Sequence, residues 1–203
     1  MKKILVLQLS LFVFCAAVFG GLAVSEDMYS QVQTTIVNIL CLSCIKINPA
    51  TTLDFTFETA NAKDHPSFIT ENLTQGVVFL VFREDVCPAC DRMEPAVQEV
   101  FEVHFEKEDT VVATKTFNGI TVTLIHITFN HSPRYLIDSY GFYDKNYIGG
   151  VPMFTVITHG YNRGFIQPYY ATLYGDLGET LEQRMNPLHE MIHEAVNLYH
   201  QNH

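Results

Sequence analysis

Basic side chains are scarce in this sequence. Its 203 residues include 12 Lys and Arg against 22 Asp and Glu, and the formal net charge is −10 at pH 7. Binding to nucleic acid depends on basic residues that neutralise phosphates, and no stripe of such residues is present. A polybasic segment for an anionic membrane surface is missing as well. The composition therefore argues against nucleic acid and against a polybasic membrane contact.

Internal repeats and low-complexity segments are also absent. The length fits one domain with an N-terminal appendage, and a hydrophobic content of 48% with 12% aromatic residues is enough for a packed core. We divide the chain into three parts: residues 1–25, an amphipathic helical segment at 26–50, and a domain over 51–203.

Residues 1–25 have the pattern of an export signal. Lys2 and Lys3 precede a nearly unbroken apolar run at 4–18, and Ala23-Val-Ser25 offers a small-x-small cleavage site. A retained anchor helix is the alternative, because the apolar stretch is just long enough to span a bilayer. Either way we expect the remaining chain to be extracytoplasmic: secreted, in a periplasm-like space, or anchored there by the uncleaved helix.

Four cysteines remain when Cys15, inside that apolar run, is set aside. They form two Cys-x-x-Cys pairs, Cys41/Cys44 and Cys87/Cys90. An even number of cysteines in an exported protein predicts dithiol or disulfide pairs, because no glutathione pool keeps thiols reduced outside the cytosol. Three roles stay open for the first pair, which lies in the predicted helical segment: a second redox pair that relays electrons, a structural clip, or half of a metal site.

The second pair, Cys87-Pro88-Ala89-Cys90, follows a continuous apolar run at 77–82 and precedes a helical pattern. Such a run predicts a strand buried on both faces. The three-residue offset puts both sulfurs on one face of the first helical turn, close enough to bridge. Free backbone N–H groups and the helix dipole favour an anion at Cys87. We therefore predict Cys87 as a nucleophile and Cys90 as the resolving thiol; a purely structural disulfide is the alternative.

The rest of the domain alternates between strand and helix patterns. Two hairpins are predicted, one around Asn118-Gly119 and one around 159–164, and 141–150 is predicted to be a loop. The predicted strands cover 53–58, 77–82, 111–116, 120–129, 153–158 and a segment from 165 onward, and the predicted helices cover 64–75, 92–108, 132–139 and 179–200.

Several features in this order resemble the thioredoxin superfamily. Cys87-Pro-Ala-Cys90 sits at a strand-to-helix junction, and Pro95 follows Cys90 by five residues. Val151-Pro152, after two glycines and before a predicted strand, is similar to the β-branched residue and cis-proline of that family. A predicted strand and helix between these motifs resemble the family's third strand and its helix.

The resemblance covers about residues 52–203. It implies an α/β, thioredoxin-like three-layer fold: a central mixed sheet flanked by helices, with the preceding helical segment as an N-terminal extension. It also implies that the proline is cis and faces the dithiol, and that the backbone before it pairs with an extended substrate segment. The substrate-binding residues implied in this way are Pro88, Ala89, Val151 and Pro152.

Two side chains typical of that family are missing. The chain has no tryptophan, and Val86 replaces the usual aromatic residue before the first cysteine. Val81 stands where many thioredoxins carry a buried acid. Aligning the third strand puts His126 where relatives often hold a lysine, and we expect His126, or a water molecule, to accept the proton of Cys90. A core histidine with a satisfied hydrogen bond is the alternative.

Acidic residues surround the dithiol. Glu84, Asp85 and Asp91 oppose a thiolate, and the residues between the two cysteines supply no histidine to stabilise one. We therefore expect a reductase-like or isomerase-like potential rather than that of a strong oxidant.

Histidines near the C-terminus raise a metal alternative. His189-Glu-Met-Ile-His193 is formally a zincin pattern, but it lies on a terminal helix and no third ligand is evident, so we expect these histidines on a solvated face. The predicted function is an exported thiol–disulfide oxidoreductase without a cofactor or metal, with protein disulfide or dithiol substrates and an upstream redox partner, membrane-bound or not. The alternative is a thioredoxin-fold metal-binding or electron-carrier module that serves a dedicated partner.

Overall fold

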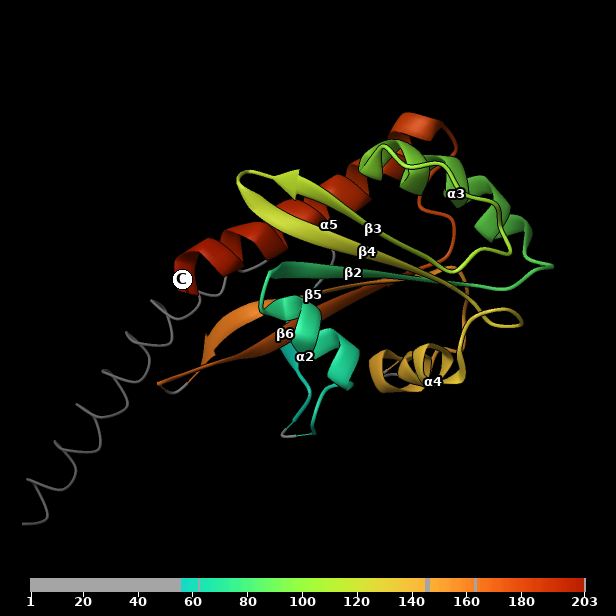
Figure 1. Ribbon diagram of the computed structural model, residues 1–203. Coiled ribbons are helices and arrows are strands. Elements are labelled where there is room, and N and C mark those ends of the chain that lie inside the picture. The colour runs from blue at the N-terminus through green and yellow to red at the C-terminus, as the bar shows by residue number, and fades with distance from the viewer. Residues whose placement is uncertain (1–55, 62, 145–146, 163, 203) are drawn as a thin grey trace, which may run out of the picture. The chain divides into compact units, whose positions relative to one another are not determined.

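The computed structural model describes residues 56–61, 63–144, 147–162 and 164–202 (Figure 1). The predicted export signal or anchor, the helical segment with Cys41 and Cys44, and most of the strand predicted at 53–58 lie outside these residues. The elements are β1 (Glu58–Thr59), α2 (Ser67–Leu73), β2 (Gly76–Arg83), α3 (Pro88–Phe101), β3 (Val111–Phe117), β4 (Ile120–Thr128), α4 (Arg134–Tyr143), β5 (Met153–Asn162), β6 (Phe165–Tyr174) and α5 (Leu181–Asn202).

The strands form one mixed sheet of six in the order β1-β6-β5-β2-β4-β3. β2 pairs in parallel with β4, from Gly76 opposite Thr121 to Arg83 opposite Thr128, and every other pair of neighbours is antiparallel. The fold is therefore α/β with a mixed sheet and helices, as predicted.

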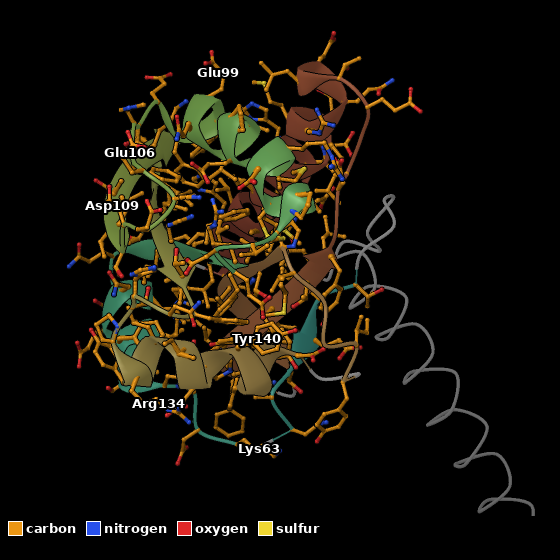
Figure 2. All side chains as sticks on the ribbon, turned by 90° about the vertical axis from the view of Figure 1, so that its right-hand side faces the viewer. Lys63, Glu99, Glu106, Asp109, Arg134 and Tyr140 are labelled. Atoms are coloured by element: carbon orange, nitrogen blue, oxygen red, sulfur yellow. A yellow bond between two sulfur atoms is a disulfide. The ribbon has the colours of Figure 1, made fainter. Side chains whose placement is uncertain are left out.

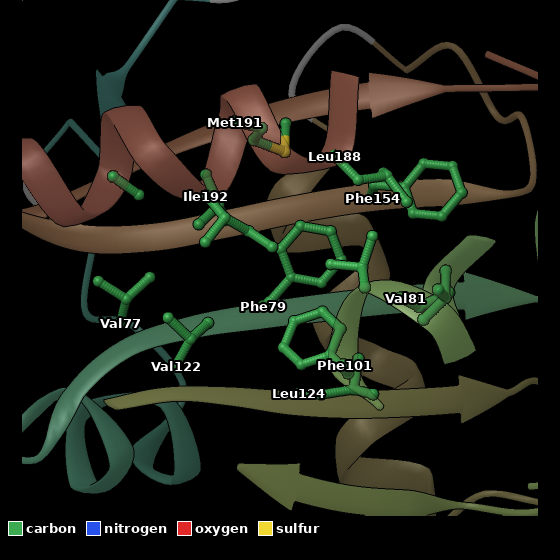
Figure 3. Packing of buried hydrophobic residues seen from close by; sticks show 14 of the residues in the cluster. Val77, Phe79, Val81, Phe101, Val122, Leu124, Phe154, Leu188, Met191 and Ile192 are labelled. Atoms are coloured by element: carbon green, nitrogen blue, oxygen red, sulfur yellow. The ribbon is translucent and has the colours of Figure 1, made fainter. Parts of the chain in front are cut away.

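β2 lies inside the sheet with helices on both sides (Figure 1). All eight of its residues are buried. Successive strand side chains point to opposite faces, so Val77, Phe79 and Val81 pack with residues of α3 and α5 (Figure 3). Val78, Leu80 and Phe82 pack with residues of α2 and α4 on the other face. The prediction of a strand buried on both faces is confirmed.

The helix predicted at 92–108 is wrong at both ends, since α3 spans Pro88–Phe101. Glu102 ends it in the left-handed conformation, with φ 54° and ψ 42°. The Val103 N–H then donates to the Gln98 carbonyl at 3.0 Å, which closes the last turn. Glycine is the usual residue at such a position, so a glutamate there gave no stop signal in the sequence.

Other boundaries also differ from the predicted ones. α4 continues to Tyr143, into the predicted loop at 141–150, because the Tyr143 side chain is buried under the sheet with α2 and β6 neighbours. β5 continues to Asn162, so the turn of the second hairpin is shorter than predicted. The hairpin at Asn118-Gly119 is confirmed, and both residues have positive φ, 49° and 82°.

α5 begins with a capping box formed by Thr180 and Gln183. The Gln183 N–H donates to Thr180 Oγ1 at 3.2 Å, and Gln183 Oε1 accepts from the Thr180 N–H, also at 3.2 Å. The helix covers one face of the sheet through Leu188, Met191 and Ile192 (Figure 3). None of the helices in the described part of the chain has the length and apolar character that crossing a membrane requires.

Candidate active site

Cys87 and Cys90 form a disulfide where β2 leads into α3, with their Cα atoms 5.2 Å apart. Cys87 is the N-cap residue of α3, and its Sγ accepts from the Cys90 N–H at 3.1 Å. Pro88 begins the helix, where its missing N–H costs no hydrogen bond. Cys87 is 7% exposed and Cys90 is 3% exposed. The sulfur of Cys87 therefore lies at a helix N-terminus, on the slightly more exposed residue of a largely buried pair.

The Val151-Pro152 segment lies directly against this disulfide. The peptide bond between the two residues is cis, and Cys87 Sγ is 3.7 Å from the Val151 carbonyl oxygen. The structure thus brings together the predicted residues of two segments that are far apart in the sequence. Pro88 is exposed and Ala89 is half-buried at the same helix start. Of the four predicted substrate-binding residues, two therefore lie between the cysteines and two belong to the segment whose Val151 carbonyl is next to Cys87 Sγ.

A small cavity of about 10 Å³ lies behind Cys90. That is the size at which a single water molecule fits. Its polar lining comes from three side chains, Arg83, Glu94 and His126, and Pro152 and Phe154 line it as well. The cavity therefore brings three ionisable side chains close to the buried Cys90.

His126 lies on β4 and is 2% exposed. Its Nδ1 is 2.9 Å from the Asp109 carbonyl oxygen, which can only accept, so Nδ1 carries a proton and Nε2 keeps a free lone pair. Burial, reinforced by the positive charge of Arg83, lowers the pKa of His126 to about 4. The ring is therefore neutral near pH 7, with one nitrogen satisfied as a core histidine and the other able to accept.

Arg83 and Glu94 are the residues of this site that the sequence analysis missed. Arg83 is 1% exposed, and its guanidinium bonds to the carboxylates of Glu94 and Asp91, the latter at 2.8 Å. A usable signal was present: Arg83 ends an apolar strand on the same face as Val81, and Glu94 stands four residues after Cys90 on one helix face. The ion pair between Arg83 and Glu94 thus lines the same cavity as Val81.

The acidic residues around the dithiol are more compensated than the sequence suggested. Asp85 accepts from Asn130 Nδ2 at 2.9 Å and from His131 Nε2 at 3.1 Å, and the first of these bonds is the main cause that lowers the pKa of Asp85. Asp91 pairs with Arg83. Glu84 is exposed. The opposition to a thiolate at Cys87 is therefore weaker than three free carboxylates would give.

Val86, in place of an aromatic residue, is 91% exposed beside Cys87. The terminal pattern His189-Glu-Met-Ile-His193 lies on α5, where His193 Nδ1 is 3.2 Å from the Asn197 amide nitrogen. Across the described residues, no group of three or more His, Cys, Asp or Glu side chains is arranged to hold a metal ion. Cys41 and Cys44 lie outside the described residues.

In comparisons with protein-family models and with curated proteins, nothing matches this chain.

Proposed function

We propose that this protein is a thioredoxin-like thiol–disulfide oxidoreductase that exchanges disulfides with protein substrates. The observation that carries the proposal is the position of Cys87: its sulfur caps α3, bonds to Cys90 and lies 3.7 Å from the Val151 carbonyl oxygen. A purely structural disulfide does not require a backbone carbonyl next to Cys87, the more exposed of its two cysteines.

The same region supports the resemblance to the thioredoxin superfamily. A mixed sheet between helices, a strand that delivers the dithiol to a helix start, and a cis Val151-Pro152 bond beside it are the features that the resemblance implies. The helix start that carries the dithiol and the Val151-Pro152 bond come from separate sequence motifs, and they lie next to each other in the fold.

In the reductive direction, the Cys87 thiolate attacks one sulfur of a substrate disulfide. The substrate S–S bond breaks, one substrate thiolate leaves, and a mixed disulfide joins Cys87 to the other substrate sulfur. Cys90 loses its proton, and its thiolate attacks Cys87 Sγ. The mixed disulfide breaks, the second substrate thiolate leaves, and two electrons have passed from the protein to the substrate. Oxidation of a substrate dithiol runs the same steps backwards.

His126 is the proposed acceptor of the Cys90 proton. It lines the cavity that Cys90 lines, it is neutral near pH 7, and its Nε2 has no proton. A pKa of about 4 makes the imidazolium short-lived, so His126 passes the proton on rather than storing it. A water molecule in the cavity is the other acceptor. From either acceptor the proton goes on to the departing substrate thiolate, so the step balances.

The redox direction we propose is reductase-like or isomerase-like. The helix N-terminus stabilises the thiolate form of Cys87. Pro88 and Ala89 place no cation beside that thiolate, and the charge of Arg83 is already paired with two carboxylates. The thiolate is then only moderately stabilised, and a moderately stabilised thiolate corresponds to a moderately reducing dithiol. The proposed setting is extracytoplasmic, with an upstream partner that restores the active redox state.

Turnover of a protein disulfide tests the proposal. We expect the full chain to reduce insulin disulfides with dithiothreitol as donor, the Cys87→Ser variant to be inactive, and the Cys90→Ser variant to accumulate a mixed disulfide with the substrate through Cys87. Absence of turnover by the wild type with any dithiol donor, together with bound copper or zinc, would favour the carrier module instead.

A further inference from the structure

The loop of residues 147–152, which precedes β5, is held by one buried carboxylate. Asp144 follows the last turn of α4 and is 5% exposed. Its Oδ1 accepts from the Ile148 N–H at 2.9 Å and from the Tyr174 hydroxyl at 2.8 Å, and its Oδ2 accepts from the Gly149 N–H at 3.0 Å. One side chain thus ties together the end of a helix, the end of β6 and the backbone before Val151.

Two further bonds fix the ends of this loop. The Tyr140 hydroxyl on α4 (Figure 2) donates to the Gly150 carbonyl at 3.1 Å. The Gly175 N–H donates to the Pro152 carbonyl at 2.8 Å. Val151 is therefore held between two anchored neighbours, and its carbonyl faces Cys87 Sγ.

The side chains of the loop do not explain its fixed position. Tyr147 is 86% exposed and Ile148 is 55% exposed, so packing of these residues contributes little to holding the backbone. The order of the loop comes from hydrogen bonds, and Asp144 supplies most of the acceptors.

A buried carboxylate is costly unless donors satisfy it. Within the described part of the chain, Asp144 meets two backbone N–H groups and one hydroxyl, and no lysine or arginine pairs with it. Burial is the main cause that raises the pKa of Tyr174, and the nearby Asp144 charge adds to it, so this hydroxyl stays protonated and remains a donor. An asparagine at 144 keeps one acceptor oxygen but turns an NH₂ group toward a donor.

We infer that Asp144 is a positioning residue for polypeptide substrates. Its carboxylate fixes the loop so that the main chain of Val151 stands ready beside Cys87 to receive an extended polypeptide. This inference rests on the proposed function. It separates two kinds of substrate, because a polypeptide needs the ordered backbone and a small disulfide needs only the sulfur of Cys87.

The Asp144→Asn variant tests the inference with two substrates, insulin and bis(2-hydroxyethyl) disulfide, which has no peptide bond. We expect kcat/KM for insulin to fall about tenfold, mainly through KM, because a charge-assisted hydrogen bond is lost. The rate constant for bis(2-hydroxyethyl) disulfide and the reduction potential of Cys87/Cys90 should stay unchanged. Asp138→Asn is the matched control, since Asp138 lies on α4, the helix that Asp144 follows, with an exposed side chain paired to Arg134.

Each other outcome has a definite meaning. Equal losses on both substrates, or a shifted potential, would overturn a positioning role, and so would an unchanged KM for insulin. If Asp144→Asn does not fold, Tyr174→Phe removes only one of the three donors, and a smaller rise in KM for insulin alone is expected. If the wild-type protein turns over neither substrate, the proposed function itself is refuted. That result is distinct from any result obtained with the variants, because it does not depend on Asp144.

Discussion

The Arg83 guanidinium on β2 and the Glu94 carboxylate on α3 form an ion pair at the wall of the cavity that Cys90 lines. Arg83 is the largest of the fully buried side chains among the described residues. A buried cation is tolerated only with partners, and Glu94 and Asp91 both come from the helix that carries Cys90. The ion pair therefore fixes the helix start to the strand and sets the charge near the buried sulfur.

Glu94→Gln should lower stability and raise the reduction potential. Breaking a buried pair costs about 3 kcal/mol of unfolding free energy, the low end of the usual range because Asp91 remains. The less compensated charge of Arg83 favours the Cys90 thiolate and so the reduced form, and we expect a rise of about 30 mV. Urea unfolding and glutathione redox equilibration measure the two effects.

Glu99→Gln is the matched control for this prediction, because Glu99 lies on the same helix, away from the cavity lining (Figure 2). An unchanged potential in Glu94→Gln, with stability reduced, would mean that the ion pair only holds the helix in place. A fall in potential would contradict the electrostatic argument.

The stability of the folded protein should decrease as pH falls from 7 to 5, in part through His126. Its pKa is about 4 in the folded state and 6.5 as the ordinary value, so the unfolded chain binds the proton more tightly across this window. Through His126, the free energy of unfolding then falls by about 2 kcal/mol between pH 7 and pH 5. The loss continues until the pH passes below the folded pKa.

Unfolding free energies at the two pH values, for wild type and His126→Phe, measure this contribution. The variant should lose about 2 kcal/mol less than the wild type. Burial also lowers the pKa values of His65 and His189, so part of the decrease remains. His104→Asn is the control, because the His104 side chain is exposed and its loss should leave the wild-type slope.

His126→Ala should slow the resolving step. If Nε2 takes the proton of Cys90, its removal should slow the attack of Cys90 on the mixed disulfide by roughly 100-fold, the lower end for general base catalysis. Single-turnover quenching across pH 5–9 measures that step directly. An unchanged pH–rate profile would show that His126 is a core histidine and that water alone carries the proton.

Local rules predicted the features that depend on neighbouring residues. The apolar run of β2, the Asn118-Gly119 turn and the dithiol at a helix start each follow from a few adjacent positions. The cis bond before Pro152 was predicted from the resemblance of the surrounding motif to that of the thioredoxin superfamily. None of these needed knowledge of distant partners.

The features that escaped prediction depend on packing between distant segments. Asp144 is significant because Tyr174 and the backbone of 148–149 converge on it, and no local pattern announces that convergence. At the end of α3, Glu102 takes the left-handed conformation that glycine usually takes, and Lys115 of β3 bonds to its carboxylate and to the Val100 carbonyl. Arg83 at the end of an apolar strand was a visible irregularity, and a buried charge there implies a partner that the sequence alone does not identify.

Gly160 on β5 and Gly141 on α4 should respond in opposite ways to alanine. A Cβ at Gly160 would lie 2.5 Å from Cδ2 of Tyr169, a buried ring on the neighbouring strand, whereas a Cβ at Gly141 meets nothing within 4 Å. Gly160→Ala should therefore cost about 2 kcal/mol of unfolding free energy through overpacking. Gly141→Ala should add roughly 0.5–1 kcal/mol, because alanine has less chain entropy to lose in a helix.

Urea unfolding of the two variants in parallel decides this prediction, with unchanged m-values as the sign that the denatured state is the same. Tyr169→Ala in the Gly160→Ala background serves as the check on mechanism, since it removes the ring that the new methyl group strikes. If Gly160→Ala costs as much without the Tyr169 ring as with it, the glycine is required by the backbone of β5 rather than by its neighbour.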